Sequence, residues 1–259
     1  MTSKKTRAET VYLSLHQAII EQALAPGSKL PEDVIGAHFG ISRTIVRSAF
    51  ARLAGEGLVD IRPKRTATVA RPSLAEARNI FEVRRSLERE AVRLVAERWK
   101  PEFGSRLEGH VRSEARESRS GSPSVSLRLA GEFHIVLAEM TGNPVLQRYV
   151  AEVASRCSLI LAVHGRPHSP ECGVHEHGDI IAALRSGDVD RAVAAMDQHL
   201  GLVEKRALLR EATAAPEEIR SVLSRYARAF DPPDGKAVVP ITKTGPREKL
   251  STSANYSKK

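Results

Sequence analysis

The sequence is poor in cysteine and in aromatic residues, and it has no long apolar run. Its two cysteines, Cys157 and Cys172, cannot form a disulfide framework and agree with a reducing cytoplasm. No stretch of about 18 apolar residues is present, so we expect no membrane-spanning helix. Aromatic residues make up 4% of the 259 residues, while alanine, leucine, arginine and glutamate dominate, which favours helices over an all-β fold.

Positive charge is present in excess, and it is distributed unevenly. The formal net charge is +9. Residues 1–72 hold 11 basic against 6 acidic side chains (+5), residues 73–210 hold 20 against 19 (+1), and residues 211–259 hold 9 against 6 (+3). A basic N-terminal quarter joined to a nearly neutral middle suggests a polyanion-binding module attached to a larger domain with another role. On charge alone, basic ends that merely aid solubility remain an alternative.

The N-terminal quarter has the pattern of three helices and a hairpin. Apolar spacing predicts helices over residues 9–25, 31–40 and 42–55, separated by Pro26-Gly27 and Gly40. Short strands are expected at 58–62 and 67–70, joined by a basic turn. This order of elements is typical of a winged helix-turn-helix.

The exposed side of the third helix carries Arg43, Thr44 and Arg47 near its N-terminal end. A helix fits the DNA major groove, where arginine can bond O6 and N7 of guanine together. The hydroxyls of Ser42 and Thr44, at the positive end of the helix dipole, can bond phosphates. Arg65 at the hairpin tip can enter a narrow minor groove. The alternative is a small helical bundle whose exposed arginines are merely solvated.

Residues 12–70 resemble the DNA-binding domain of the gluconate-repressor (GntR) family. The matching residues are Tyr12, Leu24, Pro26-Gly27, Leu30, Glu32, Phe39-Gly40, Ser42-Arg43-Thr44, Val46-Arg47, Ala49, Leu53 and Glu56-Gly57-Leu58-Val59. The resemblance implies that Arg43, Thr44 and Arg47 contact DNA from the recognition helix and that Arg65 does so from the wing. Two positions differ from the family pattern. Asp33 stands where a basic residue is frequent, and Thr66 stands where glycine usually allows the wing to approach DNA closely.

The rest of the chain is predicted to be helical, with no convincing strand after residue 70. Ser73 and Glu76 form a capping-box pattern at the start of a helix reaching about residue 100. Further helices are expected over about 101–118, 124–141, 144–163, 171–186, 188–213 and 216–230. The fold class is therefore mainly α, with a winged helix-turn-helix in residues 1–72 and an all-helical bundle in residues 73–230. Residues 231–259 are poor in apolar residues and are predicted to be disordered.

Histidines are concentrated in the bundle, where six of the nine lie between residues 134 and 199. His134, His177 and His199 fall on three different predicted helices and are expected to face inward. Three imidazoles would suit Zn²⁺ or Ni²⁺. The alternative is that they are core residues with one hydrogen bond each. The other three, His164, His168 and His175, are expected in loops or on the surface.

Residues 76–210 resemble the ligand-binding (FCD-type) domain of FadR-like regulators in the same superfamily. The matching residues are Glu82-Val83-Arg84, Glu88, Phe133-His134, Leu137, Gly142-Asn143, Glu176-His177, Ala183, Gly187-Asp188, Ala192, Met196 and His199-Leu200. The resemblance implies that the three histidines hold a divalent metal at the bottom of an effector pocket.

Two details of this resemblance affect the predicted site. The family's fourth ligand is an aspartate one helical turn before the first histidine, and this chain has Ala130 there. We therefore expect weaker metal binding and more open coordination positions. Arg84 is expected either to bind an effector carboxylate or to form a structural ion pair with Glu88.

The sequence thus predicts a cytoplasmic transcription regulator that binds a palindromic double-stranded DNA operator as a homodimer. It is expected to sense a small carboxylate-type effector and to act as a repressor rather than as an enzyme. Three alternatives stay open: metal alone as the effector, a bundle that only dimerises, and a three-histidine metalloenzyme fused to a DNA-binding module. No His-Glu-x-x-His motif and no suitably spaced acid/base carboxylate support the last.

Overall fold

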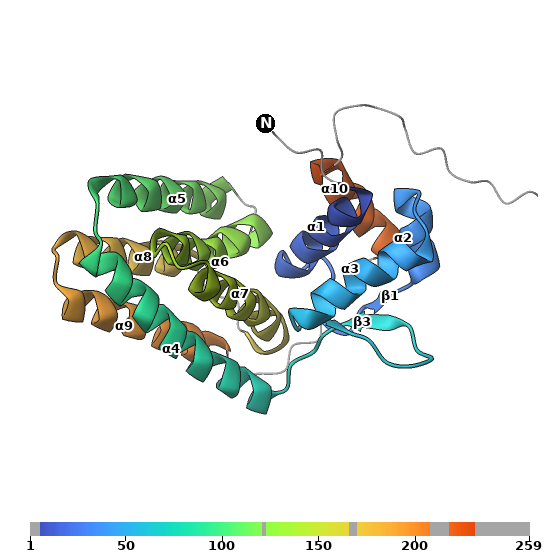
Figure 1. Cartoon of the computed structure of the whole chain (residues 1–259), viewed down its shortest axis with the longest axis horizontal. Coiled ribbons are helices and arrows are strands. Elements are labelled where there is room, and N and C mark those ends of the chain that lie inside the picture. Colours follow the sequence, from blue (N-terminus) through green and yellow to red (C-terminus); the bar gives the residue numbers. More distant parts are fainter. Residues whose placement is uncertain (1–5, 121–122, 166–169, 208–217, 231–259) are drawn as a thin grey trace, which may run out of the picture.

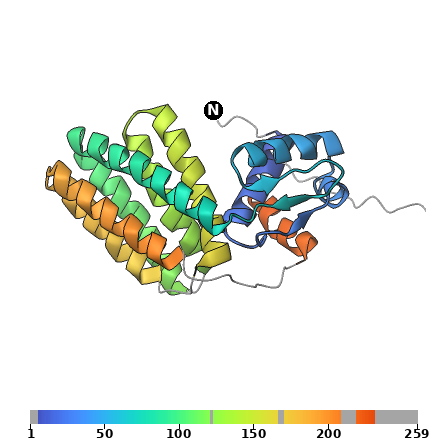
Figure 2. The same cartoon turned by 90° about the horizontal axis from the view of Figure 1, so that it is seen from below.

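The computed structural model describes residues 6–120, 123–165, 170–207 and 218–230, which form two lobes (Figures 1 and 2). We call the smaller, N-terminal lobe the head. Its elements are α1 (Arg7–Ile20), β1 (Lys29–Leu30), α2 (Glu32–Phe39), α3 (Arg43–Gly55), β2 (Val59–Asp60) and β3 (Ala67–Val69). The predicted winged helix-turn-helix is confirmed in its order of helices and hairpin.

The wing contains one strand more than the sequence pattern predicts. β3 pairs antiparallel with β2, as expected, and also with β1, which precedes α2. A strand of two residues has no periodicity to detect, so only its pairing reveals it. The third strand anchors the wing to the turn that follows α1.

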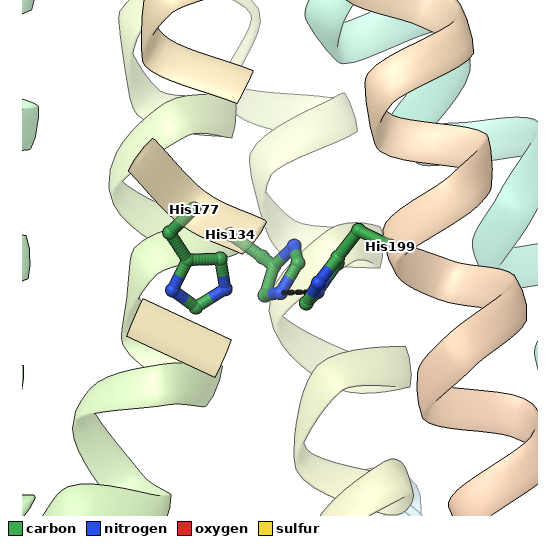
Figure 3. A group of neighbouring side chains, drawn as sticks. All are labelled: His134, His177 and His199. Atoms are coloured by element: carbon green, nitrogen blue, oxygen red, sulfur yellow. Dashed lines mark hydrogen bonds between the residues drawn. The ribbon is translucent and has the colours of Figure 1, made fainter. Parts of the chain in front are cut away.

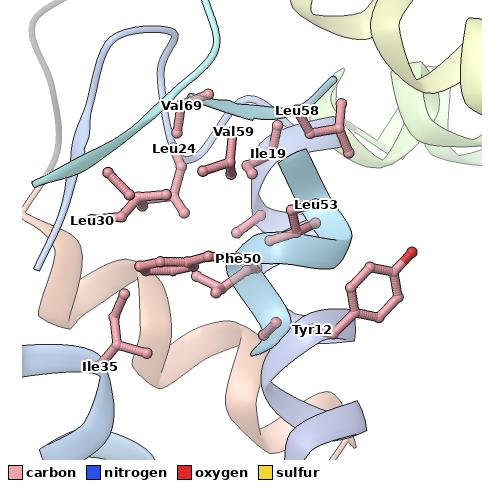
Figure 4. Packing of buried hydrophobic residues seen from close by; sticks show 14 of the residues in the cluster. Tyr12, Ile19, Leu24, Leu30, Ile35, Phe50, Leu53, Leu58, Val59 and Val69 are labelled. Carbon is pink, nitrogen blue, oxygen red and sulfur yellow. The ribbon is translucent and has the colours of Figure 1, made fainter. Parts of the chain in front are cut away.

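A single apolar core fills the head. Phe50 of α3 lies at its centre, packed among Ile19 of α1, Leu30 of β1 and Leu53 (Figure 4). The strand residue Val69 closes the core from the wing side. Burial of these side chains supplies the main favourable term for folding, since apolar area removed from water contributes about 25 cal/mol per Å².

The first helix is shorter than the predicted range of 9–25. It ends at Ile20, and Gln22 adopts a left-handed backbone conformation with φ of 59°. The amide of Leu24 then donates to the carbonyl of Ala18 at 3.0 Å, which folds the chain back. This reversal buries Leu24 in the head core, whereas a continued helix would carry it away.

The larger lobe, which we call the bundle, is all-helical within the described residues. Its helices are α4 (Leu74–Glu97), α5 (Pro101–Ser120), α6 (Pro123–Met140), α7 (Pro144–His164), α8 (Pro170–Arg185) and α9 (Val189–Ala207). The capping box of Ser73 and Glu76 is present, and Asn143 caps α7 as its pattern predicts. α4 packs against α6, α7 and α9, while α5 packs against α6 and α8. The predicted fold class is confirmed.

Two predictions fall partly or wholly outside the described residues. The helix predicted over 188–213 is described as far as Ala207, and the tail at 231–259 lies beyond the described part. No described helix is both long and apolar enough to cross a membrane.

The last helix, α10 (Ile219–Phe230), packs on the head rather than on the bundle. The sequence grouped it with residues 73–230, but it contacts α1 and α2. Its apolar face, Val222, Leu223 and Tyr226, belongs to the head core. Amphipathic spacing predicts that a helix has a buried face, but it does not predict which surface covers that face.

We predict that Leu223→Ala destabilises the head by about 2–5 kcal/mol, because the leucine is fully buried and its removal leaves a cavity. Chemical unfolding followed by a spectroscopic signal from the head measures the loss. The control is Ser224→Ala, since Ser224 is exposed on the same helix and its hydroxyl donates to the Arg220 carbonyl one turn earlier. Equal stability of the two variants would contradict the packing of α10 on the head.

Candidate metal and effector site

Three helices bring the predicted histidines together inside the bundle. His134 comes from α6, His177 from α8 and His199 from α9 (Figure 3). All three are buried, and one ligand atom from each lies within 4.8 Å of the others. The convergence predicted from the sequence is therefore present, and these are the residues that could hold a metal ion.

Each histidine is oriented by a buried or partly buried carboxylate. Nδ1 of His177 lies 2.9 Å from Glu114 of α5, and Nδ1 of His199 lies 2.7 Å from Glu176 of α8. Nδ1 of His134 bonds Glu88 of α4 in the same way. A carboxylate can only accept a hydrogen bond, so each Nδ1 carries the proton and each Nε2 keeps its lone pair. Carboxylate partners of this kind orient metal-ligating histidines.

The Nε2 atoms point toward one another, and the described part of the chain offers them no carboxylate or hydroxyl partner. Nε2 of His134 lies 3.2 Å from Nε2 of His199, along the dashed line in Figure 3. Nε2 of His177 is buried and has no hydrogen-bond partner among the described residues. Two facing lone pairs repel unless a cation or proton lies between them. Tetrahedral zinc with Zn–N distances of 2.0–2.1 Å places two nitrogens about 3.4 Å apart, so the Nε2 atoms of His134 and His199 are spaced much as two zinc ligands are. Three converging imidazoles are also a donor type that suits a divalent ion.

The protonation states also suit metal binding. Burial lowers the pKa of His134 to about 4 and that of His199 to about 3. Burial alone would raise the pKa of Glu88, but Arg84 and His134 lower it well below its usual range. At neutral pH the His134 and His199 rings are therefore neutral ligands, and Glu88, which orients His134, is ionised.

The position of the family's fourth ligand is occupied by Ala130, which has no ligand atom to offer. Ala130 lines the cavity beside the histidines, one turn before His134. Glu132 pairs with Arg128 at 2.6 Å, so it points elsewhere, as expected. The carboxylates that contact the three histidines are the orienting residues Glu88, Glu114 and Glu176. Of these, Glu114 was missed by the sequence analysis, although its seven-residue separation from buried Leu107 places both on the inner face of α5.

A cavity of about 550 Å³ adjoins the histidines. Arg84 lines it and also forms a buried ion pair with Glu88 at 2.5 Å, so both expected roles are compatible with its position. Arg206 lines it too and bonds both oxygens of Glu176 at 2.7 and 2.9 Å. Guanidinium groups and three imidazoles therefore line a cavity that is large enough for a small metabolite.

Comparison with known proteins agrees with this architecture. Residues 7–69 match the model of bacterial regulatory proteins of the gntR family, and residues 79–202 match the FCD domain. The chain is 32% identical to the HTH-type transcriptional repressor NanR of Salmonella newport strain SL254, over 78% of this chain and 85% of that protein. The chain belongs to the GntR family. It is 28% identical to the HTH-type transcriptional repressor RspR of Escherichia coli K12, over 74% of this chain and 85% of that one.

Solved structures of GntR-type proteins share the fold. The Escherichia coli protein McbR/YncC superposes with a TM-score of 0.68 at 20% identity, covering 76% of this chain and 95% of that one. A GntR regulator from Rhodococcus sp. RHA1 gives 0.68 at 22% identity, covering 78% and 98%. The chain is thus a DNA-binding transcription regulator of GntR/FCD type, and the expectation that it is not an enzyme is confirmed by its family.

The GntR head presents all six predicted DNA-contact residues on its surface. Ser42 caps α3 through its backbone and leaves its hydroxyl outside the cap, while Arg43 and Thr44 are exposed on the first turn. Arg47 is 67% exposed, and its Nε donates to Glu32 of α2 at 2.9 Å. The last two, Arg65 and Thr66, are exposed on the wing loop between β2 and β3.

The other three histidines between residues 134 and 199 have different surroundings. His164 was expected in a loop or on the surface, and this was wrong: it is buried in the last turn of α7, 2.9 Å from the Pro72 carbonyl. The predicted helix ends at residue 163, whereas α7 continues through His164. His175 is exposed, as predicted. His168 lies outside the described residues.

We predict that Ala130→Asp tightens zinc binding about tenfold or more, because it adds a charged oxygen ligand one turn from His134. Competition with a chromophoric chelator measures the affinity. The matched control is Ala130→Asn, which has the same shape without the charge. If aspartate and asparagine bind zinc equally, position 130 does not face the ion.

A second prediction concerns the orienting carboxylates. Glu114→Gln should weaken zinc binding by about 10–100-fold, because the His177 ring loses its charged partner. Glu108→Gln is the control, since Glu108 lies on the same helix in a surface pair with Arg185. The same competition assay applies, and an unchanged affinity for Glu114→Gln would exclude an ion bound through His177.

Proposed function

We propose that this regulator senses a small carboxylate-type metabolite, bound in the bundle cavity beside a divalent ion on His134, His177 and His199. The observation that carries the proposal is the convergence of three Nε2 atoms at the wall of the cavity. When bound, Zn²⁺ or Ni²⁺ would supply a positive charge with open coordination positions for the effector.

Charge and space support a carboxylate as the occupant. Three neutral ligands leave coordination positions that Ala130 does not fill. Arg84 and Arg206 add guanidinium groups, which bind carboxylates through paired hydrogen bonds. Both are already paired with glutamates, so an effector must compete for them or share them.

Metal alone is a second candidate effector. It is favoured by the short distance between the Nε2 atoms of His134 and His199, because an ion between them would remove their repulsion without any organic ligand. In both cases the bound species must favour one arrangement of the heads by a few kcal/mol to act as a switch.

On the DNA side, we propose that two heads of a homodimer bind a palindromic operator in the bacterial cytoplasm. Arg43, Thr44 and Arg47 would enter the major groove, with Ser42 on phosphate and the wing residues Arg65 and Thr66 at the minor groove. Repression is the favoured mode, because NanR and RspR are both named repressors.

Thermal-shift screening tests the effector proposal. Small carboxylates added with stoichiometric Zn²⁺ should raise the melting temperature of the wild type, since a ligand that binds the folded state stabilises it by mass action. The same compounds should have no effect on His134→Ala. Stabilisation by Zn²⁺ alone, with no further carboxylate effect, would favour metal as the effector. An equal carboxylate effect in His134→Ala would place the binding site elsewhere.

Operator binding tests the recognition helix. With a duplex selected from a random library, Arg43→Ala and Arg47→Ala should each weaken specific binding by about 1–3 kcal/mol, because each removes a base contact. Arg52→Ala is the matched control on α3, since Arg52 lies over the Tyr12 ring and pairs with Glu56. Equal effects from all three variants would indicate a general loss of charge rather than base recognition.

A further inference from the structure

α7 separates the effector cavity from the DNA-binding head. Ala154, Cys157, Ser158 and Leu161 line the cavity and recur at helical spacing. Leu159 lies on the other side, is fully buried, and belongs to the same apolar cluster as the head core. One helix therefore has the cavity on one face and the head on the other.

Polar contacts from the head reinforce this docking. Nε2 of Gln22 donates to the Ser158 carbonyl at 3.4 Å. Gly57, with φ of +71°, lies so close to Arg156 of α7 that an added Cβ would be 2.9 Å from its Nε. Any other residue at Gly57 would be strained in its backbone and would displace this arginine. The turns after α1 and α3 are both fitted to α7.

The turn after α1 also reaches the cavity itself. Glu21 and Gln22 are part of the cavity lining, although both belong to the head. Glu21 is buried and accepts hydrogen bonds from Arg128 of α6 at 2.8 Å and from Tyr226 of α10 at 2.6 Å. Gln22 holds its left-handed backbone without the freedom of glycine, so surrounding contacts must maintain it.

We propose that the position of the head depends directly on whether the cavity is occupied. A molecule in the cavity that displaces α7 or the Glu21–Gln22 turn would release the head from α7. The inference rests on the proposed effector cavity but adds the route by which its contents reach DNA. Packed interfaces shift between discrete arrangements rather than deforming continuously, so a small displacement at this wall can free the whole head.

Hydrogen–deuterium exchange on the full-length protein tests the docking. Leu159→Ala should raise exchange of amides 19–25 about tenfold while amides 189–207 in α9 stay unchanged. The matched control is Leu146→Ala, which removes the same side chain from the bundle core at the other end of α7. If both variants raise exchange at 19–25 equally, or neither does, the docking role of Leu159 is excluded.

Gln22→Gly provides a second variant if Leu159→Ala does not fold. Glycine relieves the left-handed backbone but removes the bond to Ser158. A turn with only a local structural role would exchange more slowly or unchanged in this variant. A docking turn would exchange faster, which is the expected result.

The coupling between the cavity and the head is tested by a substitution that fills the cavity with a larger side chain. Ala162 lines the cavity, so Ala162→Phe places a ring within it. Exchange at 19–25 should rise severalfold relative to the wild type, and operator affinity should change with it. Increased exchange confined to the bundle would overturn the proposal.

Parallel samples with Zn²⁺ test the metal site separately, through protection of the α8 and α9 amides from exchange. If Zn²⁺ gives no such protection, the proposed metal site is wrong, but the coupling between cavity and head is still decided by the Ala162→Phe result.

Discussion

The bundle depends on holding three imidazoles with their Nε2 atoms turned inward. Such an arrangement is unfavourable by itself, because facing acceptors repel and buried acceptors without partners lose hydrogen bonds to water. Glu88, Glu114 and Glu176 make it possible by accepting the outer N–H groups, and they come from α4, α5 and α8. These glutamate–histidine contacts thereby fix the positions of the helices around the cavity relative to one another.

Charge balance explains why arginines surround the same site. Each orienting glutamate is buried or partly buried, and Arg84 and Arg206 neutralise two of them. A cation bound among the histidines would add positive charge to a cluster whose first ligands are all neutral. Removing one member of such a network leaves a buried charge unpaired, so its members should be coupled in their effects on stability.

Much of the fold and part of the site could be predicted from the sequence. Helical spacing, caps and the Gly-Asn-Pro break gave the order of elements. The same spacing grouped His134, His177 and His199, and the resemblance implied that they hold a metal. The sequence could not show that α10 covers the head, because amphipathicity does not name a partner surface. It also missed the early end of α1, since Gln22 carries no signal for a left-handed turn. Glu114 went unnoticed because a buried glutamate in a polar helix looks like a solvated one.

The ion pair between Arg47 and Glu32 has a consequence for the search along DNA. An exposed pair of this kind is weak, because water competes for both partners, so a guanine could displace the glutamate readily where Arg47 contacts a base as proposed. Until then Glu32 offsets one of the charges that would attract any phosphate backbone. Non-specific affinity depends on the number of phosphates that a protein neutralises, so with Arg47 at the DNA as proposed, the pair would lower the retention of the regulator on random sequence. The glutamate would then shorten each unproductive encounter with DNA and favour release until a matching site is met.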